Sequence, residues 1–373
     1  MTKARYNIVI LGLSVTSSWG NGHASTYRAL MRELCARGHQ VLFLERDVPW
    51  YAAQRDLPRP PYGRTELYGS LDELQTRFGQ AVRAADLVMV GSFVPEGVAV
   101  GRWVTRAAQG ITAFYDIDTP VTLAKLAAGD EEYLARDLVP RYGLYLSFSG
   151  GPILEQIERE LGSPMARPLY CAVDPAAYQP VETPMSWDMG YLGTYSADRQ
   201  PGLDRLMLEP ARRWAAGRWV VAGPQYPADL AWPAGVARRE HVPPDQHRTF
   251  YSAQRFTLNI TRAAMARAGY SPSVRLFEAA ACGTPIISDE WAGLNLFFEP
   301  DTEILISRTP EDTLRYVREL PEAERQAIGR RARRRVLGAH TAEHRVAELE
   351  GYLAELQGGR APAVEAIESV VSS

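Results

Sequence analysis

The sequence SPSVRLFEAAACGTPIIS, residues 271–288, predicts a short buried helix, a glycine stop and a strand. Ser271 is a suitable N-cap, and Pro272 suits the first helical position, where no backbone donor is lost. Gly283 suits a left-handed C-terminal cap, and Pro285 prevents the helix from continuing. The residues between these signals are almost all apolar or small, which is typical of a helix buried on every side.

Two charged residues in this apolar helix, Arg275 and Glu278, lie three positions apart and therefore on one face. A cation in the first turn opposes the helix dipole by roughly 0.3–1 kcal/mol. An anion such as a diphosphate at the helix start would offset that cost. Arg275 and the neighbouring residues Ser271, Ser273 and Val274 would then contact it. A local Arg–Glu ion pair explains the same spacing without a ligand.

The longer run GYSPSVRLFEAAACGTPIISDEWAGL, residues 269–294, resembles the C-terminal half of CgeB-like glycosyltransferases, which are GT-B-fold enzymes that use nucleotide sugars. The resemblance is specific over this run, fair over 189–307 and weak before residue 174. It implies that Glu278 binds the ribose of the nucleotide. Retaining members of the group often carry a second glutamate eight positions earlier, near the donor sugar. This chain has Tyr270 there, so its contacts with the donor sugar are expected to differ.

Length and composition narrow the class of protein. A chain of 373 residues exceeds what one hydrophobic core usually supports, which favours two domains. The net charge of −3 gives no indication of general nucleic-acid binding. The three cysteines, Cys35, Cys171 and Cys282, lack metal-ligand spacing and are expected to be buried free thiols. No apolar run approaches the ~18 residues of a membrane span, and the N-terminus predicts a strand rather than a signal peptide. We therefore expect a cytoplasmic protein.

Short apolar runs alternate with helical patterns along the whole chain. Nearly continuous hydrophobicity is typical of parallel strands covered on both faces. One such series lies at residues 8–13, 41–44, 87–90, 112–115 and 144–148, and a second at 189–192, 219–222, 236–239, 256–260, 285–288 and 303–306. The amphipathic stretch 24–37, stopped by Gly38, predicts one of the connecting helices.

These patterns predict an α/β fold with two Rossmann-like, doubly wound parallel-sheet domains, which the GT-B resemblance arranges face to face across a cleft. We assign residues 1–174 to the acceptor-side domain and 175–340 to the donor-binding domain. The resemblance implies that a final helix within 341–360 crosses back onto the first domain. Residues 361–373 are expected to form a flexible tail.

The segment 46–70 is rich in proline and aromatic residues and shows no periodicity. A loop of this length is usually functional or disordered. We interpret it as an acceptor-side loop over the cleft, with a mobile surface loop as the alternative.

The loop SVTSSWGNGHA, residues 14–24, follows the first predicted strand. Gly20 and Gly22 allow backbone amides to approach a ligand closely, and the next helix points its positive end there. The spacing is not G-x-G-x-x-G, so a dinucleotide site is not predicted even though Glu45 ends the second strand. His23 opens the helix and is a candidate general base or hydrogen-bond donor to the sugar. A histidine that merely begins a helix is the alternative.

The sequence FYDIDTP, residues 114–120, places two aspartates after a predicted strand. Because GT-B enzymes generally do not use such a motif for a metal, we expect no metal site here. Asp118 or Thr119, followed by Pro120, suits helix capping. A carboxylate at the end of a buried strand must find a partner or face the cleft, so Asp116 is the candidate for holding the acceptor or acting as base.

The loop after residue 192 matches the family's first C-terminal-domain loop, which has a glycine after the strand and a cation six residues later. Gly193 and Arg199 occupy those places, and Arg199 would bind the donor diphosphate through its planar fork. The family often has a second cation directly after the glycine, where this chain has Thr194. Arg262, after a later strand, is the candidate substitute. Either arginine could instead lie on the surface, Arg262 more readily than Arg199.

Two further segments resemble base-contacting parts of similar enzymes. Gly223 ends a strand at a site where such enzymes place backbone beside the nucleobase. In the following loop, Val242 is a better candidate for the base contact than His241.

A run of arginines, residues 330, 331, 333, 334 and 335, lies in a predicted helix with Glu322 and Glu324 nearby. A solvated helical face is the favoured interpretation, and contact with an anionic membrane surface is the alternative.

The sequence thus predicts a glycosyltransferase that moves a sugar from a nucleotide-diphosphate donor to an unassigned glycan, protein or small-molecule acceptor. We expect no cofactor, no metal, and retention of configuration from the Glu278 context. Two other classes stay open: a sugar-nucleotide epimerase of the same fold, and a non-catalytic structural or binding protein on this scaffold.

Overall fold

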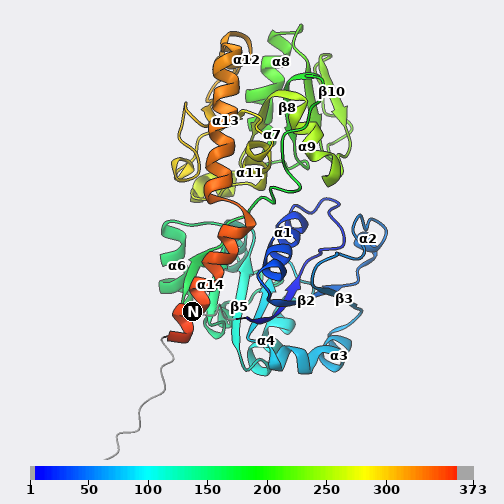
Figure 1. The fold of residues 1–373 in the computed structure, drawn as a ribbon, viewed down its shortest axis with the longest axis vertical. Helices are drawn as coiled ribbons and strands as arrows, with labels where there is room; N and C mark the ends of the chain where they lie inside the picture. The colour runs from blue at the N-terminus through cyan, green and yellow to red at the C-terminus, as the bar shows by residue number, and fades with distance from the viewer. Residues whose placement is uncertain (1–4, 359–373) are drawn as a thin grey trace, which may run out of the picture.

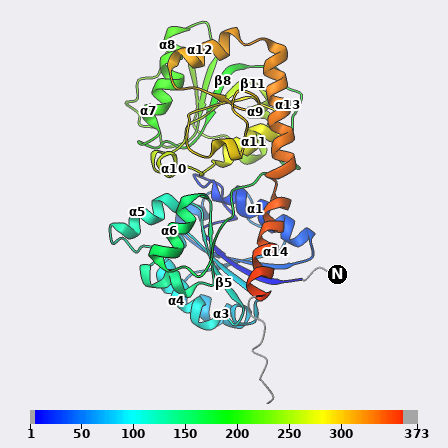
Figure 2. The ribbon, with the colours of Figure 1, turned by 90° about the vertical axis from the view of Figure 1, so that its left-hand side faces the viewer.

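The computed structural model describes residues 5–358, which form two parallel β-sheets, each covered by helices (Figures 1 and 2). The two domains are stacked along the long axis of the molecule, and all strand pairings within each sheet are parallel. This arrangement confirms the predicted pair of doubly wound domains.

The first sheet has seven strands in the order β3-β2-β1-β4-β5-β6-β7. Its strands are β1 (Asn7–Gly12), β2 (Gln40–Arg46), β3 (Arg64–Tyr68), β4 (Leu87–Gly91), β5 (Ile111–Asp116), β6 (Leu144–Ser147) and β7 (Ala166–Pro168). Its helices are α1 (His23–Ala36), α2 (Pro49–Ala52), α3 (Leu71–Ala84), α4 (Gly97–Ala107), α5 (Thr119–Ala127) and α6 (Pro152–Leu161). Strands β1, β4, β5 and β6 are buried over nearly their whole length, as their apolar runs predict.

The second sheet has six strands in the order β10-β9-β8-β11-β12-β13. Its strands are β8 (Trp187–Leu192), β9 (Trp219–Ala222), β10 (Val236–Arg239), β11 (Gln254–Asn259), β12 (Ile286–Ser288) and β13 (Leu305–Ile306). Its helices are α7 (Gln200–Leu203), α8 (Glu209–Arg213), α9 (Pro244–Ser252), α10 (Ala263–Ala268), α11 (Val274–Ala281), α12 (Pro310–Glu319) and α13 (Glu322–Ala339). The predicted helix α11 is buried on almost every side, including Arg275 and Glu278.

In both sheets the strand order reverses once, between β1 and β4 and between β8 and β11. In doubly wound sheets the loops beyond the carboxyl ends of the strands at this point form the ligand site. The loops that follow β1, β8 and β11 are therefore the expected position of a ligand site.

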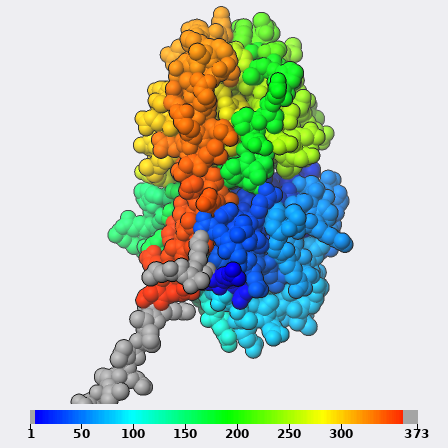
Figure 3. All heavy atoms as spheres, in the orientation of Figure 1, coloured from blue at the N-terminus to red at the C-terminus, as the bar shows by residue number. Residues whose placement is uncertain are grey.

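The chain passes between the domains twice. At one point the two crossings pair with each other: the Val173 amide donates to His340 O (3.2 Å) and the Ala342 amide donates to Val173 O (3.1 Å). Helix α14 (Ala342–Gly358) then packs against α1, where Val346, Leu349 and Leu353 join the core of the first domain. Figure 3 shows α13 and α14 as one column of atoms along the outside of both domains. The predicted return of the final helix is confirmed.

Two local predictions are wrong. Ser271 is not the N-cap of α11, because the helix begins at Val274 after Ser273, and the Ser271 hydroxyl instead donates to Gly269 O (2.9 Å). The segment 46–70 is not simply a loop, since its residues Arg64–Tyr68 form edge strand β3, paired with β2. Gly283 does adopt the predicted left-handed conformation, with φ of 73°.

The cysteines and the run of arginines noted in the sequence can be located in the structure. Cys171 and Cys282 are buried free thiols, and burial raises the pKa of each to about 12, while Cys35 is half-buried. Among the described residues, none of the helices combines the length and the apolar character that a membrane span requires. In the arginine run on α13, Arg331, Arg333 and Arg335 bond to neighbouring segments of the same domain. These bonds fit the favoured interpretation of a structural, solvated helix face.

Helix α13 contains two glycines in opposite environments, which gives a matched test of the packing. A Cβ on Gly329 would meet the carbonyl oxygen of Gly283 at 2.2 Å, whereas a Cβ on Gly338 meets nothing within 4 Å. Gly329→Ala should therefore destabilise the protein by about 1–3 kcal/mol, because backbone must move. Gly338→Ala should be neutral or stabilise by up to about 1 kcal/mol. Thermal unfolding by circular dichroism measures both; equal melting temperatures for the two variants would contradict the close α11–α13 packing.

Candidate active site

A cavity of about 340 Å³ lies between the two domains. Its walls come from the loops after β1 and β5 in the first domain and from the loops after β8, β9, β10 and β11, with the start of α11, in the second. The volume is within the range of small-molecule sites. The cavity is therefore at the position that the strand order predicts.

The N-terminus of α11 opens onto this cavity. Ser273 and Val274 line it, and no side chain caps the helix. The Ser273 hydroxyl donates instead to Asn259 Oδ1 (2.8 Å) at the end of β11. The first-turn amides of α11 are thus available to an anion, which the helix dipole also favours. Ser271 also lines the cavity, although it lies before the helix.

The Arg275 guanidinium is held in place by hydrogen bonds within the protein. Its Nε donates to Leu192 O (2.5 Å), its Nη1 donates to Asn259 Oδ1 (3.0 Å), and the group lies 4.8 Å from the centre of the Tyr191 ring. Its Nη2 lies close to Gly193. Arg275 therefore fixes the loop after β8 and places positive charge behind the anion site.

Glu278 lies one turn into α11, buried but lining the cavity. The Tyr251 hydroxyl donates to Glu278 Oε2 (3.2 Å), and His247 Nδ1 lies 3.9 Å from the same oxygen. Burial, and secondarily the charge of Glu278, raises the pKa of Tyr251 well above its usual value, so this hydroxyl keeps its proton. A carboxylate can accept about four hydrogen bonds, which leaves capacity for a ligand's hydroxyl groups.

Two other arginines line the cavity with unused donors. Arg199 donates through Nη2 to Thr194 O (2.8 Å), while its Nε is buried without a hydrogen-bond partner. Arg262 Nε is likewise buried and unpartnered. A buried guanidinium N–H without an acceptor is costly, and an anion in the cavity would satisfy it. The structure thus brings both predicted arginines to the predicted site, beside Gly193 and Thr194.

Gly223 and Val242 also line the cavity. Gly223 has φ of 144°, and a Cβ there would meet Gly193 O at 2.0 Å, so only glycine permits this approach of two loops. His247 Nε2 lies 3.0 Å from Val242 O, and His247 Nδ1 lies 3.2 Å from the Tyr178 hydroxyl oxygen. Since a carbonyl only accepts, Nε2 carries a proton, and His247 links the loop of Val242 to Glu278.

The opposite wall begins at α1. Gly20, Gly22 and His23 line the cavity, as predicted. Asn21 Oδ1 accepts from the His23 amide (3.0 Å) and so holds the helix start. His23 Nδ1 and Thr26 Oγ1 are buried polar atoms without a hydrogen-bond partner, and both residues line the cavity. Together with the two arginines, they mark a site built to contact something polar.

The structure reverses the expected positions of the two aspartates after β5. Asp116 is fully buried and does not line the cavity; it accepts hydrogen bonds from the hydroxyls of Tyr145 and Thr122 (2.7 Å for Thr122). Asp118 precedes α5 but makes no side-chain cap, and it faces the cavity instead. Asp118 Oδ2 lies 3.9 Å from His23 Nε2 and 3.6 Å from Arg262 Nη1. Asp116 thus cannot reach an acceptor directly, whereas Asp118 can.

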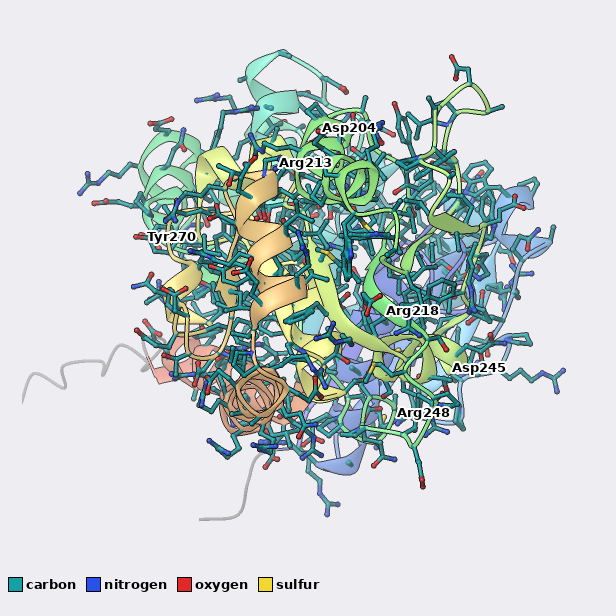
Figure 4. The ribbon with its side chains drawn as sticks, turned by 90° about the horizontal axis from the view of Figure 1, so that it is seen from above. Asp204, Arg213, Arg218, Asp245, Arg248 and Tyr270 are labelled. Atoms are coloured by element: carbon teal, nitrogen blue, oxygen red, sulfur yellow. The ribbon has the colours of Figure 1, made fainter. Side chains whose placement is uncertain are left out.

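Tyr270 occupies the position where retaining relatives often have a glutamate, and it joins the two domains. Its ring lies between Gly151 and Gly293, because a Cβ at either glycine would meet ring atoms at 2.4 Å. The Gly150 amide donates to Tyr270 O (2.9 Å), and Ser149 and Ser271 share a hydrogen bond between hydroxyls (2.5 Å). In Figure 4, Tyr270 lies on the opposite side of the domain from Asp245 and Arg248 of α9. Tyr270 is outside the cavity lining and is an interdomain contact.

Sequence reasoning missed several residues of this site, among them Asn21, Thr26, Asn259, His247 and Tyr251. Asn259 had a usable signal, since it is a polar residue at the end of an apolar strand. The other missed residues had no such signal, because they come close to the predicted site residues only in the folded protein. Within residues 5–358, no group of three or more His, Cys, Asp or Glu residues is arranged to hold a metal ion.

Residues 199–351 match the family model described as "Glycosyl transferase-like". No curated protein sequence matches the chain significantly. The matched residues include the start of α11, Glu278, Arg199 and Arg262, so the sequence match falls on the second-domain wall of the cavity.

Solved structures share the whole architecture. A sucrose-phosphate synthase from Thermosynechococcus elongatus has a TM-score of 0.69 at 16% identity, covering 94% of this chain and 99% of that chain. HepE from Anabaena, in complex with UDP and glucose, has a TM-score of 0.70 at 13% identity, covering 94% and 100%. An α-glucosyltransferase in complex with UDP and DNA containing an HMU base has a TM-score of 0.72 at 14% identity, covering 94% and 100%. The fold is GT-B, and the family match and this fold together support a glycosyltransferase.

The burial of Asp116 gives a testable pH dependence. Burial raises the pKa of Asp116 to about 6 from its ordinary 3.8, despite the hydrogen bonds from Tyr145 and Thr122. Between pH 4 and 6 the folded protein therefore holds a proton that the unfolded chain has lost, and stability falls as pH rises. Asp116→Asn removes this dependence, so its stability relative to the wild type should improve by up to about 3 kcal/mol between pH 4 and 7.

Melting temperatures of the wild type and of Asp116→Asn across this range measure the effect. Asp229→Asn, at an exposed carboxylate, is the matched control and should show a constant difference. A constant difference for Asp116→Asn as well would contradict the raised pKa.

Proposed function

We propose that this chain is a metal-independent glycosyltransferase that transfers a sugar from a nucleoside-diphosphate donor to an acceptor held by the first domain. The observation that carries the proposal is the cavity itself: the uncapped N-terminus of α11, the unpartnered Nε atoms of Arg199 and Arg262, and Glu278 all face one interdomain space. A diphosphate fits the first two features, and a ribose diol fits the carboxylate.

The residues that line the cavity support one orientation of the donor. The diphosphate would lie at Ser273 and Val274, the ribose at Glu278, and the base beyond it towards Gly223 and Val242. The sugar would then project towards the first domain, where His23 and Asp118 lie. The UDP present in the HepE and α-glucosyltransferase structures supports a nucleoside diphosphate, and makes UDP the first probe to use.

Leaving-group charge would be stabilised by fixed groups rather than by a metal ion. Helix amides, Arg199 and Arg262 supply positive potential in a partly enclosed space, and such preorganised groups need little reorganisation during the reaction. His23 lines the first-domain side of the cavity and would contact the sugar or the acceptor hydroxyl. Asp116 would act only indirectly, as the buried support below Asp118, to whose amide it is hydrogen-bonded (3.3 Å).

Replacing Glu278 tests the ribose assignment. Loss of hydrogen bonds to a charged group costs about 1.5–3 kcal/mol, so Glu278→Ala should raise the Kd for UDP by well over tenfold. Glu278→Gln keeps an acceptor for Tyr251 and guards against misfolding. Glu290→Ala, at an exposed carboxylate paired with Arg308, is the matched control and should leave Kd unchanged. Isothermal titration calorimetry gives these values, and an unaltered Kd in both Glu278 variants would refute the assignment.

Turnover experiments test the chemistry. With UDP-sugars and a panel of acceptors, release of UDP should persist in excess EDTA, and the product should keep the anomeric configuration of the donor. NMR of the product reads the configuration, and inversion would overturn retention. Incubation with donor alone identifies an epimerase, which changes the sugar without releasing nucleotide. A non-catalytic scaffold releases no nucleotide even when cell extract supplies acceptors.

A further inference from the structure

Asp118 lies between an arginine and a histidine from different domains. Its Oδ2 is 3.6 Å from Arg262 Nη1, in the second domain, and 3.9 Å from His23 Nε2, in the first. Asp118 stands at the N-cap position of α5, yet its side chain does not cap that helix. All three residues line the cavity, so one carboxylate is shared at the gap between the domains.

Arg262 is incompletely satisfied in this arrangement. Its second carboxylate neighbour is Asp198, whose Oδ2 lies 3.8 Å from Arg262 Nε. Neither contact is a hydrogen bond, and Nε is buried without one. A guanidinium prefers two parallel hydrogen bonds to one oxyanion, and a diphosphate in the same cavity offers them. A bound diphosphate would therefore compete with Asp118 and Asp198 for the Arg262 guanidinium.

The protonation of the His23 imidazole would respond to this exchange of partners by Arg262. His23 Nδ1 is buried without a partner, and the His23 ring packs 5.7 Å from the centre of the Phe93 ring. Asp118, from the loop before α5, lies beside the ring. The charged residues that line the same cavity from the second domain are Arg199, Arg262, Arg275 and Glu278. The helix that His23 begins contributes the positive end of its dipole. Asp118 is the carboxylate within 4 Å of the ring.

We propose that binding of the donor diphosphate draws Arg262 away from Asp118, and that Asp118 then pairs with His23 and holds a proton on its imidazole. The inference rests on the proposed function and specifies how the donor prepares the reacting face. Without the diphosphate, the Asp118 carboxylate interacts with both Arg262 and His23. With the diphosphate bound, Asp118 interacts with His23 alone. With Nε2–H directed at Asp118, a protonated His23 has Nδ1–H left to donate one hydrogen bond to the donor sugar, in a chain that lacks a glutamate at position 270.

Proton NMR of the histidine Cε1–H signals tests the proposal on the full-length protein, without an acceptor. His23→Gln assigns the His23 signal among the six histidines of the chain. Saturating UDP should raise the titration midpoint of His23 by about one pH unit, since an opposite charge within about 4–6 Å favours the charged form by at least this much. In Asp118→Asn this rise should be lost, although UDP still binds.

Arg262→Gln should give His23 a raised midpoint before UDP is added and little further change afterwards. Asp130→Asn, at an exposed carboxylate paired with Lys125, and Arg267→Gln, at an exposed arginine of α10, are the matched controls and should behave as the wild type. An equal rise in Asp118→Asn would overturn the proposal, because the phosphate itself would then act on His23. No rise in the wild type with bound UDP would also overturn it.

Inorganic pyrophosphate separates this inference from the proposed function. If pyrophosphate raises the midpoint in the wild type but not in Asp118→Asn, while UDP fails to bind, the coupling stands and the nucleotide assignment falls. If UDP binds but neither probe moves His23, the nucleotide site stands and the coupling falls.

Discussion

The side chain of Asn259 connects the segments that form the second-domain wall of the cavity. Its Oδ1 accepts from Ser273 and Arg275 on either side of the α11 start, and its Nδ2 donates to Thr261 and Ser288 (3.2 and 3.0 Å). A fully buried amide with its donors and acceptors satisfied is rigid, and the segments it bonds share that rigidity. The anion site depends on this one residue, because it directs Ser273 away from capping the helix and holds Arg275 over the loop after β8.

The fold was largely predictable because its strands are buried on both faces and therefore read as continuous apolar runs. Strand β3 escaped detection since it is an edge strand with the polar sequence RTELY inside a proline-rich segment, so it carries no such run. The start of α11 was misplaced by two residues because two serines flank Pro272 and local capping rules suit either. Hydrogen bonds outside the helix distinguish them: Ser271 bonds to Gly269 O and to the Ser149 hydroxyl, and Ser273 bonds to Asn259.

The site was predictable where one short segment supplies it, as around Glu278, and not where separate loops meet. The aspartates after β5 show the limit. Residues two apart at the end of a strand differ completely in environment, since Asp116 points below the loop to Tyr145 and Thr122 while Asp118 faces the second domain. Likewise the sequence could not reveal that Arg275 is held by Leu192 and Asn259, whereas Arg199 and Arg262 keep an unpartnered nitrogen.

The interdomain contact of Tyr270 has a mechanical consequence. With its ring seated between a glycine of each domain, and with Gly150 and Ser149 bonded across the same boundary, the domains cannot slide past one another there. The paired crossings at Val173 and Thr341 form a second fixed point. The domains also meet where α5 lies against α10 and Asp118 Oδ2 approaches Arg262 Nη1 (3.6 Å). The spacing of the two cavity walls is therefore set by direct contacts between the domains as well as by the two chain crossings.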